Sequence, residues 1–274
     1  MSELLKTHDL TVDGVRVRLH QSGAGPDVLL LHGFPETLQS YWDVAPRLAQ
    51  RFRVHAIDWP GFGASDRPRG FDYSPRGFAA FLEKLLPALE LKNPHLVGAD
   101  IAMSPILLFA AAHPDRAGKI VVGDGKWAVR PRTLSWELRV IETPILSSVL
   151  VHLAPRMAMA MTWQRGFFRP RRLPRPIWED MLTPARYADA RAISSRYFLA
   201  MNRDLATCEQ RVREVKSPLL VVWGSHDVFI DKAMGEELAA VTGARLEIIP
   251  EAGHFLHQEN PAQFATLVEQ FLTA

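Results

Sequence analysis

The chain has 274 residues, of which 47% are hydrophobic and 23% charged, a composition that suits a soluble globular protein with a large buried core. A formal net charge of +2 is too small to favour nucleic acid or an anionic membrane as a partner, and we expect neither. Cys208 is the only cysteine, which excludes an intrachain disulfide and suits a reducing cytoplasm. The apolar runs are short, so we expect neither a secretory signal nor a membrane span.

Short apolar runs alternate with longer helical patterns along most of the chain, which predicts βαβ units and a mainly parallel sheet. Residues 15–20 alternate between apolar and polar side chains, as an early edge strand does. Patterns of fully buried strands follow at 27–32, 53–58, 95–98, 119–123, 218–223 and 245–249. Helical patterns lie between them at about 38–50, 75–90, 101–113, 230–241 and 260–273.

The alternation breaks between residues 126 and 215, where helical periodicity with many prolines, tryptophans and arginines replaces the strand patterns. We interpret 126–215 as a helical cap inserted between two strands, and 1–125 with 216–274 as the core. Ligands bind at the carboxyl-end rim of open α/β sheets, so a cap at that rim would exclude water and shape a pocket. A purely structural helical subdomain is the alternative.

Asp100 lies where the strand at 95–98 bends into a helix. Gly98 and Ala102 stand two residues before and after it, a spacing typical of a nucleophile elbow, in which bulk at either position would clash. The helix that follows directs its amide dipoles at Asp100 and favours negative charge there. A helix N-cap aspartate would give the same local pattern, so this motif does not decide by itself.

Two further polar residues follow late strands of the predicted sheet. Asp227 comes just after one buried strand, and His254 lies in the loop after the next. The chain order Asp100, Asp227, His254 is the nucleophile, acid and base order of hydrolase triads. Asp124 is an alternative acid with a weaker motif.

A loop after the strand at 27–32 supplies a fourth component. The backbone amide of Phe34 is expected to form an oxyanion hole together with the amide of Ile101. We expect the Phe34–Pro35 bond to be cis, as X–Pro bonds at tight functional turns sometimes are.

Five motifs of the core support this assignment. They are His-Gly-Phe-Pro-Glu-Thr at 32–37, Asp-Trp-Pro-Gly-Phe-Gly-Ala-Ser-Asp at 58–66, Gly-Ala-Asp at 98–100, Gly-Ser-His-Asp at 224–227 and Gly-His-Phe at 253–255. Together they resemble the epoxide hydrolases and the related haloalkane dehalogenases of the α/β-hydrolase superfamily. The resemblance covers about 10–125 and 215–274. It implies an α/β-hydrolase fold with a mainly parallel eight-stranded sheet and helices on both faces. It also implies a small apolar organic substrate and no metal or organic cofactor, and it leaves a homodimer open.

The resemblance has departures that bear on the reaction. Haloalkane dehalogenases typically have a tryptophan after the nucleophile and often an asparagine in the oxyanion loop, where this chain has Ile101 and Phe34. Epoxide hydrolases often have a histidine before the nucleophile and a glycine two residues after it, where this chain has Ala99 and Ala102.

Epoxide hydrolases also use two cap tyrosines that donate hydrogen bonds to the epoxide oxygen. The resemblance implies that Tyr197, shortly before the strand at 218–223, is the second of these tyrosines. For the first tyrosine, or for other pocket contacts, the candidates are Tyr187, His152 and Trp163.

An aspartate at the elbow favours substitution at saturated carbon, which leaves an alkyl ester on the enzyme. A water activated by His254 would then cleave that ester. Epoxide hydrolysis to a vicinal diol is the leading prediction, and haloalkane dehalogenation is the alternative. A non-hydrolytic biosynthetic enzyme or a ligand receptor on the same fold is a third hypothesis.

Overall fold

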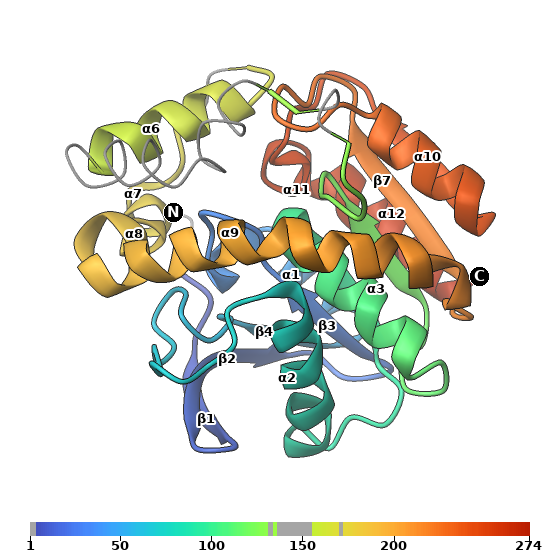
Figure 1. Cartoon of the computed structure of the whole chain (residues 1–274), viewed down its shortest axis with the longest axis horizontal. Coiled ribbons are helices and arrows are strands. Elements are labelled where there is room, and N and C mark those ends of the chain that lie inside the picture. The colour runs from blue at the N-terminus through green and yellow to red at the C-terminus, as the bar shows by residue number, and fades with distance from the viewer. Residues whose placement is uncertain (1–3, 131–133, 136–154, 170–171) are drawn as a thin grey trace.

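The computed structural model describes residues 4–130, 134–135, 155–169 and 172–274. Eight strands form one sheet in the order β1-β2-β4-β3-β5-β6-β7-β8 (Figure 1). Their bounds are β1 His8–Val12, β2 Val15–Ser22, β3 Asp27–Leu31, β4 Arg53–Ile57, β5 His95–Ala99, β6 Ile120–Gly123, β7 Leu219–Gly224 and β8 Arg245–Ile249. β1 and β2 run antiparallel to their neighbours, and all other neighbouring strands are parallel. The predicted mainly parallel eight-stranded sheet is confirmed.

The first strand, β1, was not predicted. It forms a hairpin with β2 through Asp13 and Gly14, whose φ angles are +50° and +77°. Two consecutive positive φ angles define the type I′ turn that suits the twist of a hairpin, and Asp-Gly is among its preferred sequences. The dipeptide was therefore a readable signal for a strand on its N-terminal side.

The side chains of β3 alternate between two core layers. Leu29 and Leu31 pack in the layer under α2, α3 and α9, whereas Val28 and Leu30 pack in the layer under α1 and α12. The sheet is therefore covered by helices on both faces, as predicted; Figure 1 shows α2, α3 and α9 over the near face. The helices outside the segment between β6 and β7 are α1 Ala45–Leu48, α2 Pro75–Ala88, α3 Met103–Ala112, α10 Ala233–Thr242, α11 Leu256–Glu259 and α12 Pro261–Thr273.

The helix predicted over 38–50 is instead two short ones. A 3-10 helix, η1, covers Leu38–Tyr41, and α1 begins afresh at Ala45. Pro46 lies in the first turn of α1, where its missing amide is tolerated but where it cannot continue an earlier helix.

Between β6 and β7 the described residues form α6 Pro155–Gly166, α7 Arg175–Met181, α8 Thr183–Arg186, α9 Ala188–Arg211 and the 3-10 helix η4 Val212–Glu214. The 24-residue helix α9 packs directly against α2 and α3. A separate cap with the limits 126–215 stays a prediction. The helix α9 belongs to that segment by sequence, but it packs against the core helices α2 and α3. None of the described helices has both the length and the apolar composition needed to cross a membrane.

Candidate active site

A sharp turn at the end of β5 carries Asp100. Its φ is +53°, in the left-handed region that few residues other than glycine adopt, and the 3-10 helix η2 (Asp100–Ala102) leads from there into α3. A Cβ atom on Gly98 would lie 2.8 Å from the Ala102 Cβ and 2.7 Å from the Ile106 Cδ1, so no larger residue fits at this position. The local geometry is that of the predicted nucleophile elbow.

Backbone amides hold the carboxylate of Asp100. Its Oδ2 accepts a hydrogen bond of 2.6 Å from the Phe34 amide, and the Ile101 amide donates a second bond to the carboxylate. An N-cap residue would have an extended backbone and accept from amides further along its own helix, whereas Asp100 has a positive φ and bonds across to Phe34. The helix-cap interpretation therefore does not describe Asp100.

The loop that carries Phe34 is supported by a buried acid, Glu36. The Phe34–Pro35 bond is cis, as predicted. Glu36 Oε2 accepts a hydrogen bond of 2.8 Å from the Gly33 amide, and its Oε1 lies 3.0 Å from His257 Nε2. Burial alone would raise the pKa of Glu36, but His257 and the Gly33 amide outweigh it and hold that pKa below its usual value. Sequence reasoning missed this role, although Glu36 follows directly in the same motif.

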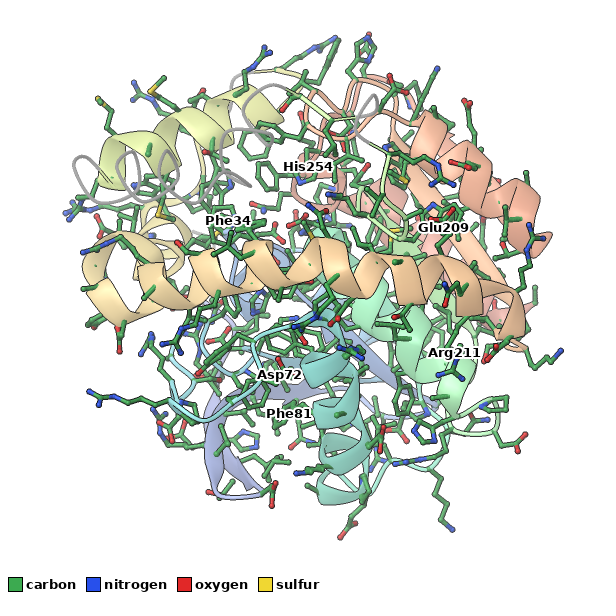
Figure 2. All side chains as sticks on the ribbon, in the orientation of Figure 1. Phe34, Asp72, Phe81, Glu209, Arg211 and His254 are labelled. Carbon is green, nitrogen blue, oxygen red and sulfur yellow. The ribbon has the colours of Figure 1, made fainter. Side chains whose placement is uncertain are left out.

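His254 lies between two carboxylates. Its Nδ1 is 2.9 Å from Asp227 Oδ2, and its Nε2 faces Asp100 Oδ1 at 3.8 Å. The other oxygen of Asp227 accepts hydrogen bonds from the amides of Phe229 (2.8 Å) and Ile230 (3.0 Å), which fix the acid in place. The structure thus brings the three predicted side chains together, and Figure 2 shows both Phe34 and His254 above α9 in the view.

Burial and charge shift the titration of these groups in opposite directions. Burial raises the pKa of the Asp100 carboxyl to about 6, although His254 and the Phe34 amide oppose the shift. Burial alone would lower the pKa of His254, but the charges of Asp227 and Asp100 outweigh it and raise that pKa to about 10. The two carboxylates therefore favour the protonated form of the His254 imidazole.

Asp124, the alternative acid, follows β6 and is fully buried. Its Oδ1 accepts a hydrogen bond of 3.0 Å from the Gly224 amide at the end of β7. Burial, with a further contribution from the negative charge of Asp227, raises the pKa of Asp124 well above its usual value. It is Asp227 that pairs with His254. Within the described residues, no three His, Cys, Asp or Glu side chains are grouped to hold a metal ion.

Tyr197 of α9 is bonded to the backbone beside Asp100. Its hydroxyl donates a hydrogen bond of 2.8 Å to the carbonyl oxygen of Ile101, and the ring is buried under the elbow. A cavity of about 20 Å³ lies beside Asp100, and Tyr197 is not among the residues that line it. These lining residues are Asp100, Ile101, Ser104, Lys126, Phe198, Met201 and Ile230. The Tyr197 hydroxyl is thus bonded to the backbone in this structure, and its donation to a substrate stays a prediction.

The other predicted cap residues lie elsewhere or outside the described residues. Tyr187 is 51% exposed, and the Arg67 guanidinium covers its ring at 5.0 Å from the centroid. Trp163 stacks on Phe255 with ring centroids 5.4 Å apart and lines a separate cavity of about 330 Å³. His152 lies outside the residues that the structure describes.

Lys126 is a charged residue of the cavity that sequence reasoning missed. Its side chain is buried, and its Nζ donates a hydrogen bond of 3.1 Å to the Asn202 Oδ1 of α9. A lysine is usually solvent-exposed, so the residue type alone did not indicate that Lys126 is buried. The available signal was its place just after β6, at the end of the sheet where Asp100 also lies.

A model of the alpha/beta hydrolase family matches residues 28–267. Haloalkane dehalogenase 2 of Mycobacterium bovis is 28% identical, and the alignment covers 94% of this chain and 93% of that protein. Epoxide hydrolase 3 of Xenopus tropicalis is 26% identical over 93% of this chain and 75% of its own length. The 2-hydroxymuconate semialdehyde hydrolase of Pseudomonas sp. strain CF600 is 25% identical over 96% and 93%. The names of these three relatives refer to three different substrate classes.

Proposed function

The chain belongs to the alpha/beta hydrolase family, and we propose that it hydrolyses its substrate through a covalent ester on Asp100. The observation that carries this proposal is the setting of the Asp100 carboxylate. Oδ2 is bound by the Phe34 amide at 2.6 Å, while Oδ1 faces His254 Nε2 at 3.8 Å. One oxygen is thus held as a future carbonyl oxygen, and the other remains to attack.

In the first step Asp100 Oδ1 attacks a saturated carbon of the substrate. The new bond joins that oxygen to carbon, and the electron pair of the breaking bond goes to the leaving atom. Because carboxylates are poor nucleophiles towards amides and esters but can displace strained or activated groups at saturated carbon, an aspartate favours epoxides or alkyl halides as substrates.

The second step depends on the loss of the negative charge of Asp100 in the first step. Esterification makes Asp100 neutral, so one of the negative charges that keep the pKa of His254 at about 10 disappears. His254 can then give up its proton to solvent, and Nε2 accepts a proton from a water that attacks the ester carbon. When the tetrahedral intermediate collapses, the bond between the acyl carbon and the alkoxy oxygen breaks, the departing alcohol takes the proton from His254, and the regenerated Asp100 carboxyl returns its proton to His254. The amides of Phe34 and Ile101 stabilise the oxyanion on Asp100, and Asp227 stabilises the imidazolium.

Epoxide hydrolysis to a vicinal diol is the reaction we propose. One relative named above is called an epoxide hydrolase, and the core motifs resemble that group. Haloalkane dehalogenation is the second candidate, since another relative is called a haloalkane dehalogenase. It is disfavoured because Ile101 offers no side-chain N–H to a halide beside the elbow.

The base variant His254→Gln tests the covalent mechanism. Alkylation of Asp100 should proceed in this variant while hydrolysis stalls, so intact-mass spectrometry should detect a stable adduct. An epoxide should add its whole mass, and a haloalkane should add the alkyl group without the halide. The control Asp100→Asn with His254→Gln should form no adduct. An active wild type whose His254→Gln variant never becomes heavier would exclude the ester.

A further inference from the structure

We propose that the cavity of about 330 Å³ lined by Trp163 is a binding site for an organic anion that has an apolar body and a carboxylate group. Its walls come from α6, α7 and the neighbouring chain. The described residues of these walls differ from those beside Asp100, so the site goes beyond the proposed function and does not depend on it. Its volume lies in the range of small-molecule pockets, roughly 300–1,000 Å³.

Aromatic rings form much of the apolar wall. Trp163 of α6 and Trp178 of α7 meet edge to face, with ring centroids 5.4 Å apart. Ala160 and Leu173 add aliphatic surface to the same cavity. Because large rings held by packing can cover much of a ligand's apolar area, these walls suit an aromatic or aliphatic body.

The charged side chains on the described walls are Arg172 and Arg175. Both arginines are solvent-exposed, so they place positive charge at the opening of the cavity. Neither guanidinium has a carboxylate partner among the described residues, and none of the described residues on the walls is acidic. The planar fork of a guanidinium matches a carboxylate in geometry and charge. The cavity therefore fits a ligand whose apolar body lies inside and whose carboxylate lies at the opening.

Trp163 provides a second observation that favours a ligand with oxygen acceptors. The residue is 2% exposed, and its Nε1 has no hydrogen-bond partner within the part of the chain that the structure describes. Buried donors in proteins normally have a partner. The indole N–H and the two guanidiniums are all donors, and a carboxylate is a group that only accepts.

The cavity is close to the loop that carries His254. Trp163 stacks on Phe255, the next residue along that loop, with an interplanar angle of 15°. The His254 amide donates a hydrogen bond of 2.8 Å to the Gly166 carbonyl oxygen at the end of α6. The proposed anion site is therefore a neighbour of the candidate active site with walls of its own.

Titration calorimetry with 4-phenylbutyrate tests the site, since this probe joins one benzene ring to one carboxylate. The wild type should bind it, and the uncharged 4-phenylbutanamide should bind about tenfold more weakly. Replacing both arginines, as Arg172→Gln with Arg175→Gln, should weaken binding of the carboxylate about tenfold and leave binding of the amide unchanged. The control Arg169→Gln removes an exposed arginine that is paired with Glu251, and both affinities should stay as in the wild type.

Two further variants locate the bound probe. Ala160→Phe adds a ring to the cavity wall and should abolish binding of both probes, whereas Asp100→Asn should leave both affinities unchanged. Should Ala160→Phe not fold, the arginine variants still decide, because their side chains are exposed. A wild type that does not bind 4-phenylbutyrate, or that binds the amide equally well, overturns the proposal. Loss of binding in Asp100→Asn also overturns it, because the probe would then lie beside the elbow. Failure to form an ester on Asp100 would refute the proposed reaction and leave this site intact.

Discussion

In the proposed mechanism Asp100 must be ionised to attack, and burial raises the pKa of this carboxyl to about 6. The ionised fraction is nearly complete above that pH and falls about tenfold per pH unit below it. The pre-steady-state rate of alkylation should therefore be constant at neutral pH and decline as the pH falls through about 6. His254 lowers the pKa of Asp100, so the decline should begin at a higher pH in His254→Gln. Rapid-quench measurements across about two pH units on either side would check both statements. A midpoint that does not move between wild type and variant would contradict the assigned coupling.

The meeting of Asp100, Asp227 and His254 could be predicted because each residue follows a strand end. Strand ends in a parallel sheet meet at one edge, so motif spacing alone brings Asp100, Asp227 and His254 together. The hydrogen bond of the Tyr197 hydroxyl could not be predicted in this way. Its place in a helix of the cap segment says nothing about which carbonyl its hydroxyl reaches, and the partner it has is 96 positions away. The burial of Lys126 could not be predicted either, because it depends on the tertiary packing around the side chain.

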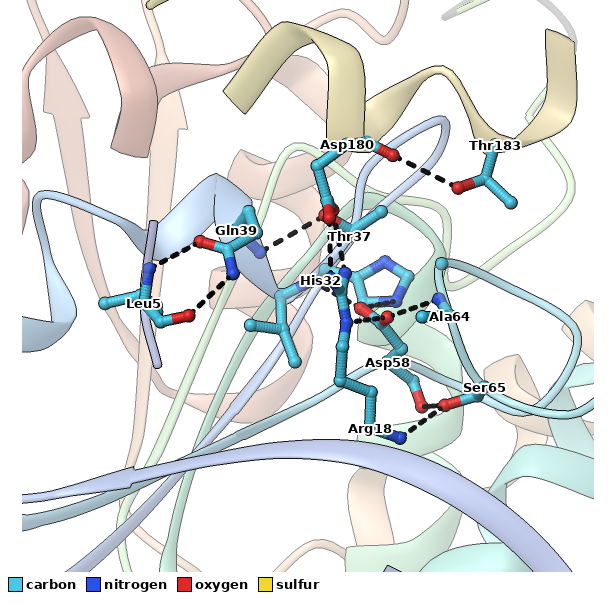
Figure 3. A network of polar contacts seen from close by, with 12 residues as sticks. Leu5, Arg18, His32, Thr37, Gln39, Asp58, Ala64, Ser65, Asp180 and Thr183 are labelled. Atoms are coloured by element: carbon cyan, nitrogen blue, oxygen red, sulfur yellow. Dashed lines mark hydrogen bonds and ion pairs between the residues drawn. The ribbon is translucent and has the colours of Figure 1, made fainter. Parts of the chain in front are cut away.

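At the scale of elements, α7 is bound to the core by a network of charged side chains (Figure 3). The Arg18 guanidinium of β2 forms two hydrogen bonds to Asp180 of α7, at 2.6 and 2.7 Å. The same guanidinium donates a bond of 2.6 Å to Asp58, and the Thr37 hydroxyl donates one of 2.7 Å to Asp180. Thr37 adjoins Glu36, so the network joins α7 to the loop that carries the Phe34 amide.

Removing this attachment should destabilise the protein. Asp180→Ala removes a bidentate acceptor from an arginine that is only 11% exposed, and the free energy of unfolding should fall by about 1–3 kcal/mol. Arg169→Ala is a matched control, because the Arg169–Glu251 pair also joins the segment between β6 and β7 to the core but is largely exposed. Urea unfolding followed by fluorescence measures both. If Asp180→Ala is no less stable than Arg169→Ala, the network does not hold α7.

The elements show where local patterns succeed and fail. Buried strands such as β3 and β7 were predicted within a residue or two, because both of their faces are apolar and their ends are marked by polar residues. The hairpin strand β1 was missed although Asp13 and Gly14 mark its turn. The helix over 38–50 was overextended because hydrophobic periodicity continues across Pro46 even where the backbone does not.

At the scale of the whole molecule, the two core layers fix the sheet, and the sheet fixes the edge at which Asp100, Asp227 and His254 meet. The fold was predictable from alternation and motifs because these repeat along the chain. The surroundings of the cavity were not, since they depend on how α9 and the loop after β6 pack together. The lining of the cavity therefore depends on tertiary contacts, whereas the place of Asp100 in the fold could be read from local sequence.

The most direct test of the ester on Asp100 is a single turnover of excess enzyme in water labelled with heavy oxygen. If water attacks the carbon of the ester, the product's new hydroxyl oxygen comes from Asp100 and is unlabelled in the first turnover. The heavy oxygen should then be found in the peptide that contains Asp100, as peptide mass spectrometry can measure. If the first turnover instead gives a labelled product and an unlabelled Asp100, water attacks the substrate directly and the mechanism proposed here is wrong.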